Sequence, residues 1–265
     1  MQIGRGTRIL LRIATIAILA FIYVPIGVIV LYSFNASRVA TWPIGGLTLD
    51  WYGRAFADEG IRSALGASLV AALGATTIAL VVGTLIAVAV QRYRFFGRDA
   101  VSFLVILPIA LPGIVTGIAL NTAFRAIGFE LGMFTIIVGH ATFCVVTVYN
   151  NVLARLRRTS ATYEEASADL GADTFRTFRR VTLPAIRTAL VAGALLAFAL
   201  SFDEIIVTNF TAGAGIQTLP IWIFSNYARP NQLPLVNVAA VLVLVLSIVP
   251  VYIATRITHG EGATR

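Results

Sequence analysis

The sequence contains no lysine, one cysteine and two histidines among its 265 residues. Without lysine, the chain has neither the phosphate-binding lysine of a P-loop ATPase nor a residue for Schiff-base chemistry. Its single cysteine, Cys144, cannot form an intramolecular disulfide, and its position in an apolar run is typical of a small buried side chain. These absences exclude an ATPase of the P-loop class.

Charged residues are also scarce, at 12% of the sequence, compared with about 25% in an ordinary soluble domain. The mean hydropathy is +0.88, and long apolar runs recur that can each span a bilayer as a helix. We expect an all-α integral membrane protein in which residues 1–265 form one transmembrane domain. The first span exceeds the length of a signal-peptide core, so we expect it to be retained. The six predicted spans are Ile9–Phe34, Ile61–Gln91, Ala100–Phe124, Leu131–Leu153, Ala185–Phe210 and Leu235–Ile257.

The arginines are distributed unequally between the two sides of these spans. Counted over alternate segments, 15 of the 20 arginines lie on one side and 5 on the other. The side with more arginines faces the cytoplasm in membrane proteins, which predicts that both termini are cytoplasmic. The segments Asn35–Gly60 and Thr211–Pro234 then face outward. Because the arginines lie between apolar spans and not along one polar face, the net charge of +8 does not indicate nucleic-acid binding.

Two patterns predict how the spans pack. Small residues that recur at every fourth position let two helix backbones approach closely in a membrane. The third span contains the sequence LPIALPG at Leu107–Gly113, whose two prolines predict a bend or break. The small residues of the second span, which we expect to face another helix, are Ala67, Ala71, Ala75, Ala79, Gly83 and Ala87.

A charged segment separates the fourth and fifth spans. Thr162 and Glu165 fit a capping box, which predicts a short helix that begins near Tyr163. Gly171 is expected to end this helix in the left-handed conformation, and Asp173 to cap a second turn. The segment could rest on lipid headgroups, but its first helix is acidic and an anionic membrane would repel it. We therefore favour a protein partner on the cytoplasmic side.

The sequence EASADLGADTFRTFRRVTLP resembles the EAA signature of permeases in binding-protein-dependent ABC importers. This signature consists of E-A-A, three residues, G, nine residues and I-x-L-P. Two positions depart from it, because Ser167 replaces the third alanine and Val181 replaces isoleucine. The resemblance implies that this segment is a coupling helix that docks into a separate ATPase subunit. The positions that fit the signature, with every spacing kept, are Glu165, Ala166, Gly171, Leu183 and Pro184.

Four further segments resemble the second permease of spermidine/putrescine-type importers. The resemblance implies the type I importer permease fold, in the cytoplasmic (inner) membrane of a bacterium. It also implies a second permease subunit, two ATPase subunits that bind ATP and Mg²⁺, an extracytoplasmic solute-binding protein, and no cofactor in this chain. Related permeases carry opines, aminophosphonates, thiamine or iron, and these solutes remain alternatives to polyamines. The four segments are Leu47–Phe56, His140–Leu156, Leu200–Phe210 and Thr218–Asn231.

Two acidic residues, Asp203 and Glu204, fall within the predicted fifth span. Charged groups are costly inside a bilayer, so such residues usually face a cavity or a partner. They are candidates for contact with a cationic solute, and the alternative is an ion pair or hydrogen bond to a neighbouring helix. If both belong to one helix, they point about 100° apart and cannot face one pore equally.

Three aromatic residues and one histidine complete the candidate sites. Trp222, Phe224 and Tyr227 are candidates either for an interfacial aromatic belt or, by the resemblance, for the outer gate and the contact with the binding protein. His140 lies in the fourth span without acids or cysteines at metal-ligand spacing, which favours a structural hydrogen bond over a metal site or a proton relay.

Two other functional classes fit the sequence less well. A transporter that works alone predicts inverted repeats with paired broken helices, whereas the sequence shows one proline-rich break and no convincing repeat. A membrane-embedded enzyme needs a catalytic constellation within its spans. The spans contain one cysteine, one histidine and one Asp-Glu pair, and none of them belongs to a catalytic motif.

Overall fold

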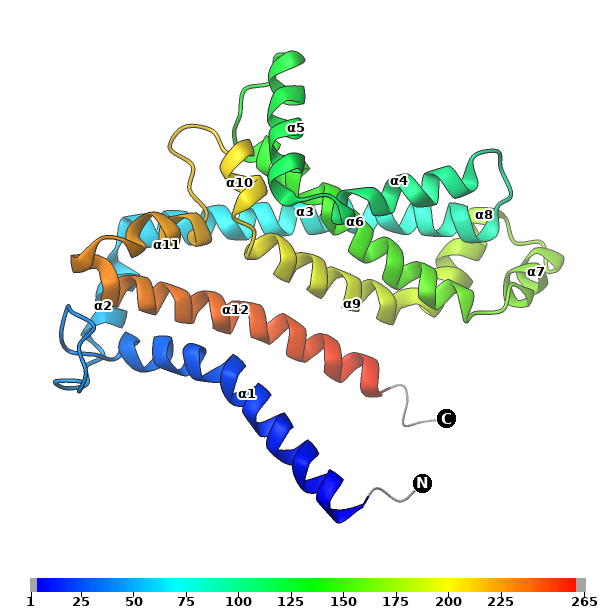
Figure 1. Cartoon of the computed structure of the whole chain (residues 1–265). Helices are drawn as coiled ribbons and strands as arrows, with labels where there is room; N and C mark the ends of the chain where they lie inside the picture. Colours follow the sequence, from blue (N-terminus) through cyan, green and yellow to red (C-terminus); the bar gives the residue numbers. More distant parts are fainter. Residues whose placement is uncertain (1–3, 261–265) are drawn as a thin grey trace. The chain divides into compact units, whose positions relative to one another are not determined.

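The computed structural model describes residues 4–260, and these form helices joined by short loops, without a named strand among them. Figure 1 shows the order of the helices. The chain divides into two compact units, which are described separately: Met1–Arg62 with Ile223–Leu244, and Ser63–Trp222 with Val245–Arg265. The extreme residues at the two termini, which the arginine pattern places in the cytoplasm, lie outside the described residues. The predicted single domain and the predicted orientation both stay predictions.

The first unit holds the loop that follows the first helix. The indole of Trp51 is buried and donates a hydrogen bond to the backbone oxygen of Asn35 at 2.9 Å. The hydroxyls of Ser33 and Tyr52 lie 2.8 Å apart. These contacts fix the turn between helix and loop through side chains of the LTLDWYGRAF segment. The helices of this unit are α1 (Arg5–Ser33), α2 (Asp50–Ala57), the second part of α11 (Leu219–Tyr227) and the first part of α12 (Leu233–Gly260).

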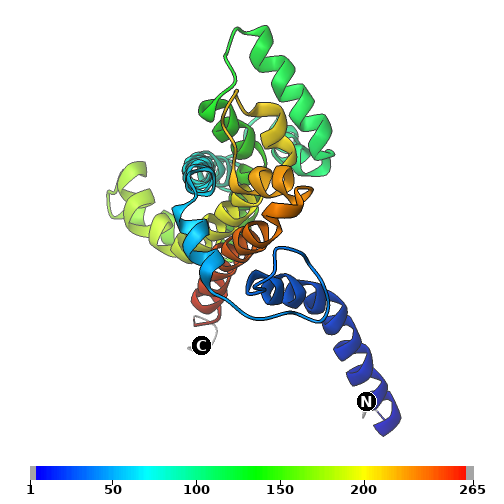
Figure 2. The ribbon, with the colours of Figure 1, turned by 90° about the vertical axis from the view of Figure 1, so that its left-hand side faces the viewer.

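The second unit is built around one central helix. Buried residues lie along the whole length of α6, which packs against α9 and against the small-residue face of α3. Figure 1 and Figure 2 both show α7 protruding at one end of this unit. Its elements are α3 (Glu59–Arg92, except its first turn), α4 (Arg98–Ala110), α5 (Gly113–Ala126), α6 (Met133–Arg157), α7 (Thr162–Asp169), α8 (Thr174–Thr177), a π-helical turn (Phe178–Thr182), α9 (Leu183–Phe202), α10 (Ile206–Thr211), the first part of α11 and the second part of α12.

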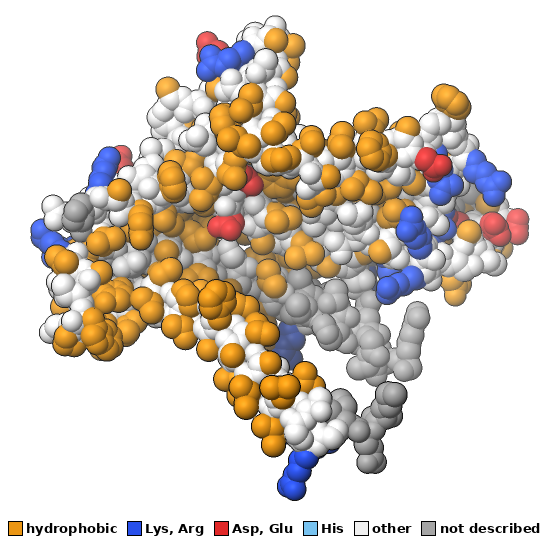
Figure 3. All heavy atoms as spheres, viewed as in Figure 1, with side chains coloured by type: hydrophobic (Ala, Val, Ile, Leu, Met, Phe, Trp, Pro, Cys, Tyr) orange, Lys and Arg blue, Asp and Glu red, His pale blue; other side chains and the backbone are white. Residues whose placement is uncertain are grey.

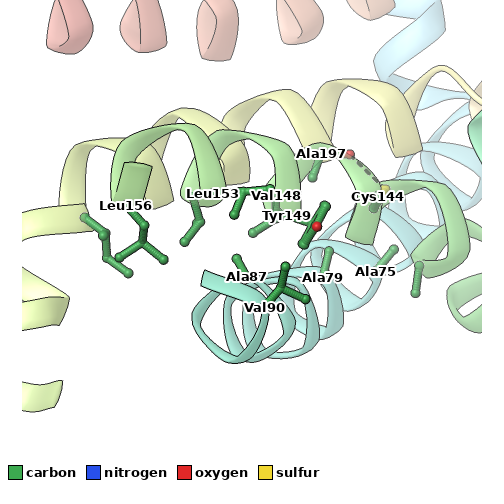
Figure 4. Packing of buried hydrophobic residues seen from close by; sticks show 13 residues of the cluster. Ala75, Ala79, Ala87, Val90, Cys144, Val148, Tyr149, Leu153, Leu156 and Ala197 are labelled. Carbon is green, nitrogen blue, oxygen red and sulfur yellow. Dashed lines mark hydrogen bonds between the residues drawn. The ribbon is translucent and has the colours of Figure 1, made fainter. Parts of the chain in front are cut away.

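The small-residue face of α3 packs against α6 as predicted. Ala75 and Ala79 are fully buried beside Tyr149 (Figure 4). A Cβ atom added to Gly83 would lie 3.0 Å from the backbone oxygen of Val145 and 3.1 Å from the backbone nitrogen of Tyr149. The two backbones are therefore in contact, and the apolar area between them consists of small side chains on one helix and large ones on the other.

Five of the helices are long and apolar enough to cross a membrane, and α4 with α5 adds a sixth if this bent pair is one span. The two members of the pair meet at an angle of 109°. The break lies at Leu111 and Pro112, where the backbone is extended, so the predicted break in LPIALPG is confirmed. Figure 3 shows a largely apolar surface over α4 and α5, and arginine side chains around α7 and α8.

The predicted fifth span, Ala185–Phe210, is wrong at both ends. The helix begins at Thr174, because α8, the π-helical turn and α9 follow one another without a break. It ends at Phe202, and α10 is a separate short helix. Pro184 lies in the first turn of α9, directly after the wide turn in which Leu183 N–H donates to the Phe178 oxygen five residues back. Such a turn accommodates the missing proline donor.

Candidate coupling surface and transport site

The helix α7 begins one residue earlier than expected, and the predicted capping box does not form. Ala161 is the residue before the helix, and no side chain caps it. The hydroxyl of Ser160 instead accepts the backbone N–H of Thr162 at 3.2 Å. Thr162 already lies inside the helix, so its side chain cannot serve as the N-cap for Glu165.

The end of α7 follows the sequence prediction. Gly171 has a φ of 80°, and the N–H of Ala172 donates to the oxygen of Ser167 at 3.1 Å. This bond pattern is the Schellman motif, in which a left-handed glycine closes the helix. Asp173 then accepts the N–H of Arg176 at 2.8 Å and caps α8, as predicted. The glycine and the cap turn the chain sharply, so α7 is presented as a separate short helix.

The outer surface of this turn carries exposed apolar side chains. Leu170 is 89% exposed, and the rings of Tyr163 and Phe175 are also exposed. Among the residues that fit the EAA signature, four are exposed and Leu183 is partly buried. Large exposed apolar side chains beside acidic residues are typical of a surface that meets another protein. The exposed signature residues are Glu165, Ala166, Gly171 and Pro184.

Glu164, which the sequence analysis did not select, fastens α7 to the rest of the unit. Its carboxylate lies 2.9 Å from the Arg92 guanidinium at the end of α3. It also accepts a hydrogen bond from the Thr182 hydroxyl in the π-helical turn, at 2.8 Å. Glu164 therefore joins α7 both to α3 and to the base of α9. No local sequence pattern predicts these contacts, because Arg92 and Thr182 are distant from Glu164 in the sequence. The sequence marks this position only by the adjacent acidic pair Glu164–Glu165.

A cavity of about 710 Å³ lies beside this anchor. Four arginines line it, and Glu164 is the acidic residue of the lining. Arg155 donates from its Nε to the backbone oxygen of Ala185 at 2.9 Å. The cavity is strongly electropositive, as expected for the side with more arginines. The four arginines are Arg92, Arg155, Arg158 and Arg180.

Asp203 and Glu204 do not lie in one continuous helix, which corrects the sequence-based expectation. Both lie in the break between α9 and α10. Glu204 accepts the backbone N–H of Val207 at 2.9 Å and so satisfies the first turn of α10. Asp203 is exposed, and none of the described residues donates a hydrogen bond to its carboxylate. The two acids therefore differ because Glu204 caps α10 and Asp203 is exposed, and not because they point in different directions from one helix.

Polar side chains from α5 and α6 hold the short helix α10. Asn121 donates to the backbone oxygen of Phe210 at 2.6 Å, and Thr135 donates to that of Thr211 at 2.7 Å. Gly117 lies against the Phe210 ring, which a Cβ atom at that position would meet at 2.6 Å. These contacts satisfy the carbonyls at the end of α10, which lipid could not do.

His140 makes structural hydrogen bonds, which confirms the prediction from sequence. Its Nδ1 lies 2.7 Å from the Ser201 hydroxyl and its Nε2 lies 2.8 Å from the Thr208 hydroxyl. No group of three metal-ligating side chains occurs among the described residues. Cys144 is buried as predicted, and its thiol points to the backbone oxygen of Ala197 at 3.3 Å (Figure 4).

The aromatic residues of α11 differ in exposure. Trp222 is buried, whereas Phe224 is 74% exposed and Tyr227 is also exposed. The N–H of Leu219 at the start of the helix donates to the Ser68 hydroxyl at 2.8 Å. The three residues thus do not form one aromatic surface, and only Phe224 and Tyr227 are available to a partner.

Long apolar helices, a broken span and a protruding helix between two spans place the chain in the class of integral membrane proteins. The chain belongs to the family described as binding-protein-dependent transport system inner membrane component, whose sequence model matches residues 79–260. It is similar to the putrescine transport system permease protein PotI of Escherichia coli (strain K12), with 37% identity over 84% of this chain and 82% of the relative. It is also similar to the spermidine/putrescine transport system permease protein PotC of the same organism, with 36% identity over 92% of each chain.

Solved structures show the same fold. A chain of a bacterial alginate ABC transporter, solved with a periplasmic protein bound to an alginate pentasaccharide, superposes with a TM-score of 0.72 at 16% identity. The match covers 95% of this chain and 93% of that one. A chain of the MetNI methionine ABC transporter gives a TM-score of 0.60 at 20% identity, over 83% of this chain and 100% of that one. The type I importer permease fold predicted from the sequence is confirmed.

Proposed function

We propose that this chain is a permease subunit that moves polyamines across the cytoplasmic membrane, driven by a separate ATPase. The putrescine and spermidine names of relatives that are 36% and 37% identical support this solute class. The positions that resemble the EAA signature support the coupling role of α7. ATP and Mg²⁺ bind to the ATPase subunits, and a second permease subunit completes the pathway.

The observation that carries the proposal is the exposed carboxylate of Asp203 at the end of α9. The last carbonyls of a helix make its C-terminus partly negative, and an ionised aspartate adds to this field. The negative field at the end of α9 offsets part of the hydration that a cation loses when it leaves water, whereas the same field repels an anion. Asp203 is therefore the solute contact, and Glu204, whose carboxylate holds α10, supports it.

The partners follow from the exposed surfaces at the two predicted sides. On the cytoplasmic side, the exposed side chains of α7 dock into the ATPase, with Glu165 and Ala166 at the interface and Gly171 holding the turn. On the outer side, the exposed Phe224 and Tyr227 contact the solute-binding protein. This arrangement makes the chain a link between capture of the solute outside and ATP hydrolysis inside.

The test is uptake of labelled putrescine and spermidine into proteoliposomes that contain ATP and the assembled transporter. Asp203→Asn is expected to lower uptake per assembled complex by about tenfold, which corresponds to the loss of about 1.4 kcal/mol of interaction between the carboxylate and the cationic solute. Glu204→Gln is expected to act less on uptake, because the amide oxygen can still accept the Val207 N–H. Unchanged uptake in both variants and in the double variant would remove these carboxylates from the pathway. Transport of an opine, an aminophosphonate, thiamine or iron in place of polyamines would overturn the solute assignment.

A further inference from the structure

Three buried polar side chains connect the helices on both sides of the α9–α10 break. His140 on α6 is fully buried and contacts Ser201 on α9 and Thr208 on α10 through its two ring nitrogens. Ser201 and Thr208 are also buried. Ser201 precedes Asp203 by two residues, and Thr208 follows Glu204 by four. One imidazole ring therefore spans the break that contains both acids.

The hydrogen positions in this network follow from the single hydroxyl hydrogen of Thr208. That hydroxyl donates to the backbone oxygen of Glu204 at 2.9 Å. Its oxygen can therefore only accept from His140, so Nε2 carries the ring hydrogen. In a neutral imidazole, Nδ1 is then an acceptor, and the Ser201 hydroxyl donates to it. The chain of donors runs in one direction, from Ser201 through His140 and Thr208 to the Glu204 carbonyl.

This network controls the backbone next to Asp203 from two directions. The end of α9 is tied through Ser201, and the residue after Asp203 is tied through its carbonyl. Glu204 is also held by its own side chain on Val207. The Asp203 N–H donates to the Ala199 oxygen at 3.2 Å, which continues the helical pattern of α9. The side-chain network adds contacts on both sides of this residue, and together they decide where the Asp203 carboxylate points.

We propose that His140 is a positioning residue that holds the Asp203 carboxylate in the geometry that binds the cationic solute. This inference rests on the proposed role of Asp203 as the solute contact. His140 itself does not touch the solute, because its ring is buried and both nitrogens are occupied. Loss of the network allows the break to relax, so the carboxylate samples other directions and solute affinity in the membrane falls.

The primary test compares His140→Leu with Asp203→Asn and with the double variant, in the full transporter, with uptake normalised to assembled complex. His140→Leu is expected to raise the KM for spermidine by about tenfold and to change the maximal rate by less than about twofold. In the Asp203→Asn background, the same substitution is expected to leave KM unchanged, because its target is gone. A role in folding alone would reduce the amount of complex or the maximal rate, and it would act equally in both backgrounds.

Two milder sets of variants serve if His140→Leu prevents assembly. Thr208→Val keeps the side-chain shape but removes both hydrogen bonds, so it is expected to raise KM in the same way. His140→Gln places an amide N–H near the Nε2 position and is expected to restore part of the affinity lost in His140→Asn, which reaches only toward Ser201. An equal KM in Thr208→Val, His140→Asn and the unmodified protein would overturn the inference. Unchanged KM in Asp203→Asn would instead overturn the role of Asp203, which separates the two failures.

Discussion

The ion pair between Glu164 and Arg92 anchors α7, and a single substitution can test this anchor. Glu164→Gln keeps the size of the side chain and an oxygen that can accept the Thr182 hydroxyl hydrogen, so it removes only the charge. The variant therefore isolates the ion pair from the hydrogen bond. It does not alter the residues of the EAA signature that face the proposed ATPase partner.

The magnitude follows from burial. The Arg92 side chain is 12% exposed and that of Glu164 is 20% exposed. Exposed pairs contribute about 0–1 kcal/mol, and breaking a fully buried pair costs about 3–5 kcal/mol. A pair with this intermediate burial is worth about 1–3 kcal/mol, which shifts the equilibrium between anchored and released α7 by about 5- to 150-fold. A released α7 cannot transmit movement between the proposed ATPase and the spans, so the variant is expected to weaken the coupling of ATP hydrolysis to transport.

The assay is ATP hydrolysis by the reconstituted transporter, measured with and without solute-loaded binding protein. Glu164→Gln is expected to lower the stimulated rate by at least about fivefold, with the basal rate nearly unchanged. Asp169→Asn is the matched control, because it removes an exposed acid from the same helix. Arg92→Gln is expected to match Glu164→Gln, and the double variant is expected to be no worse than either. Wild-type stimulation in Glu164→Gln, or additive losses in the double variant, would refute the anchoring role.

Three further perturbations test the surrounding structure. Gly171→Val is expected to cost about 1–2 kcal/mol through the left-handed backbone alone, because its Cβ would have no neighbour within 4 Å; it should reduce stimulated ATP hydrolysis, and Gly171→Asn should recover most of that activity. Gly83→Leu is expected to force α3 from α6 and lower thermal stability in detergent, whereas Leu73→Phe on the exposed face should not; equal melting temperatures would contradict this packing. Asn121→Leu is expected to leave the Phe210 carbonyl unsatisfied and to destabilise the complex by about 1–3 kcal/mol in denaturant titration, and a change below about 0.5 kcal/mol would count against this contact as a support of α10.

Much of the fold was predictable from the sequence because its signals are local. Apolar runs located the long helices to within a few residues, except for the fifth, and the predicted third span corresponds to the bent pair of α4 and α5. Two prolines predicted the break between α4 and α5, and spacing by four predicted the face of α3 that meets α6. Gly171 and Asp173 were predictable because a left-handed glycine and an N-terminal cap act on their own neighbours.

The remaining features depend on contacts that local patterns do not contain. The fifth span reads as continuous because the residues after Glu204 are apolar, and only the tertiary contacts of α10 show that the helix stops at Phe202. The capping box failed because Thr162 already has helical geometry in the structure. Glu164 was not selected because its partners, Arg92 and Thr182, become neighbours only after α3, α7 and α9 have packed.

The 109° bend between α4 and α5 has a consequence for the stability of the isolated subunit. A helix that ends leaves up to about four carbonyl groups without partners inside the helix. Hydrocarbon chains offer no donors, so these groups need protein or trapped water beside them. If a second subunit covers the bend, its association contributes directly to folding, by mass action. In that case the unfolding free energy of this chain depends on the partner, and the midpoint of its unfolding transition rises with the concentration of the partner.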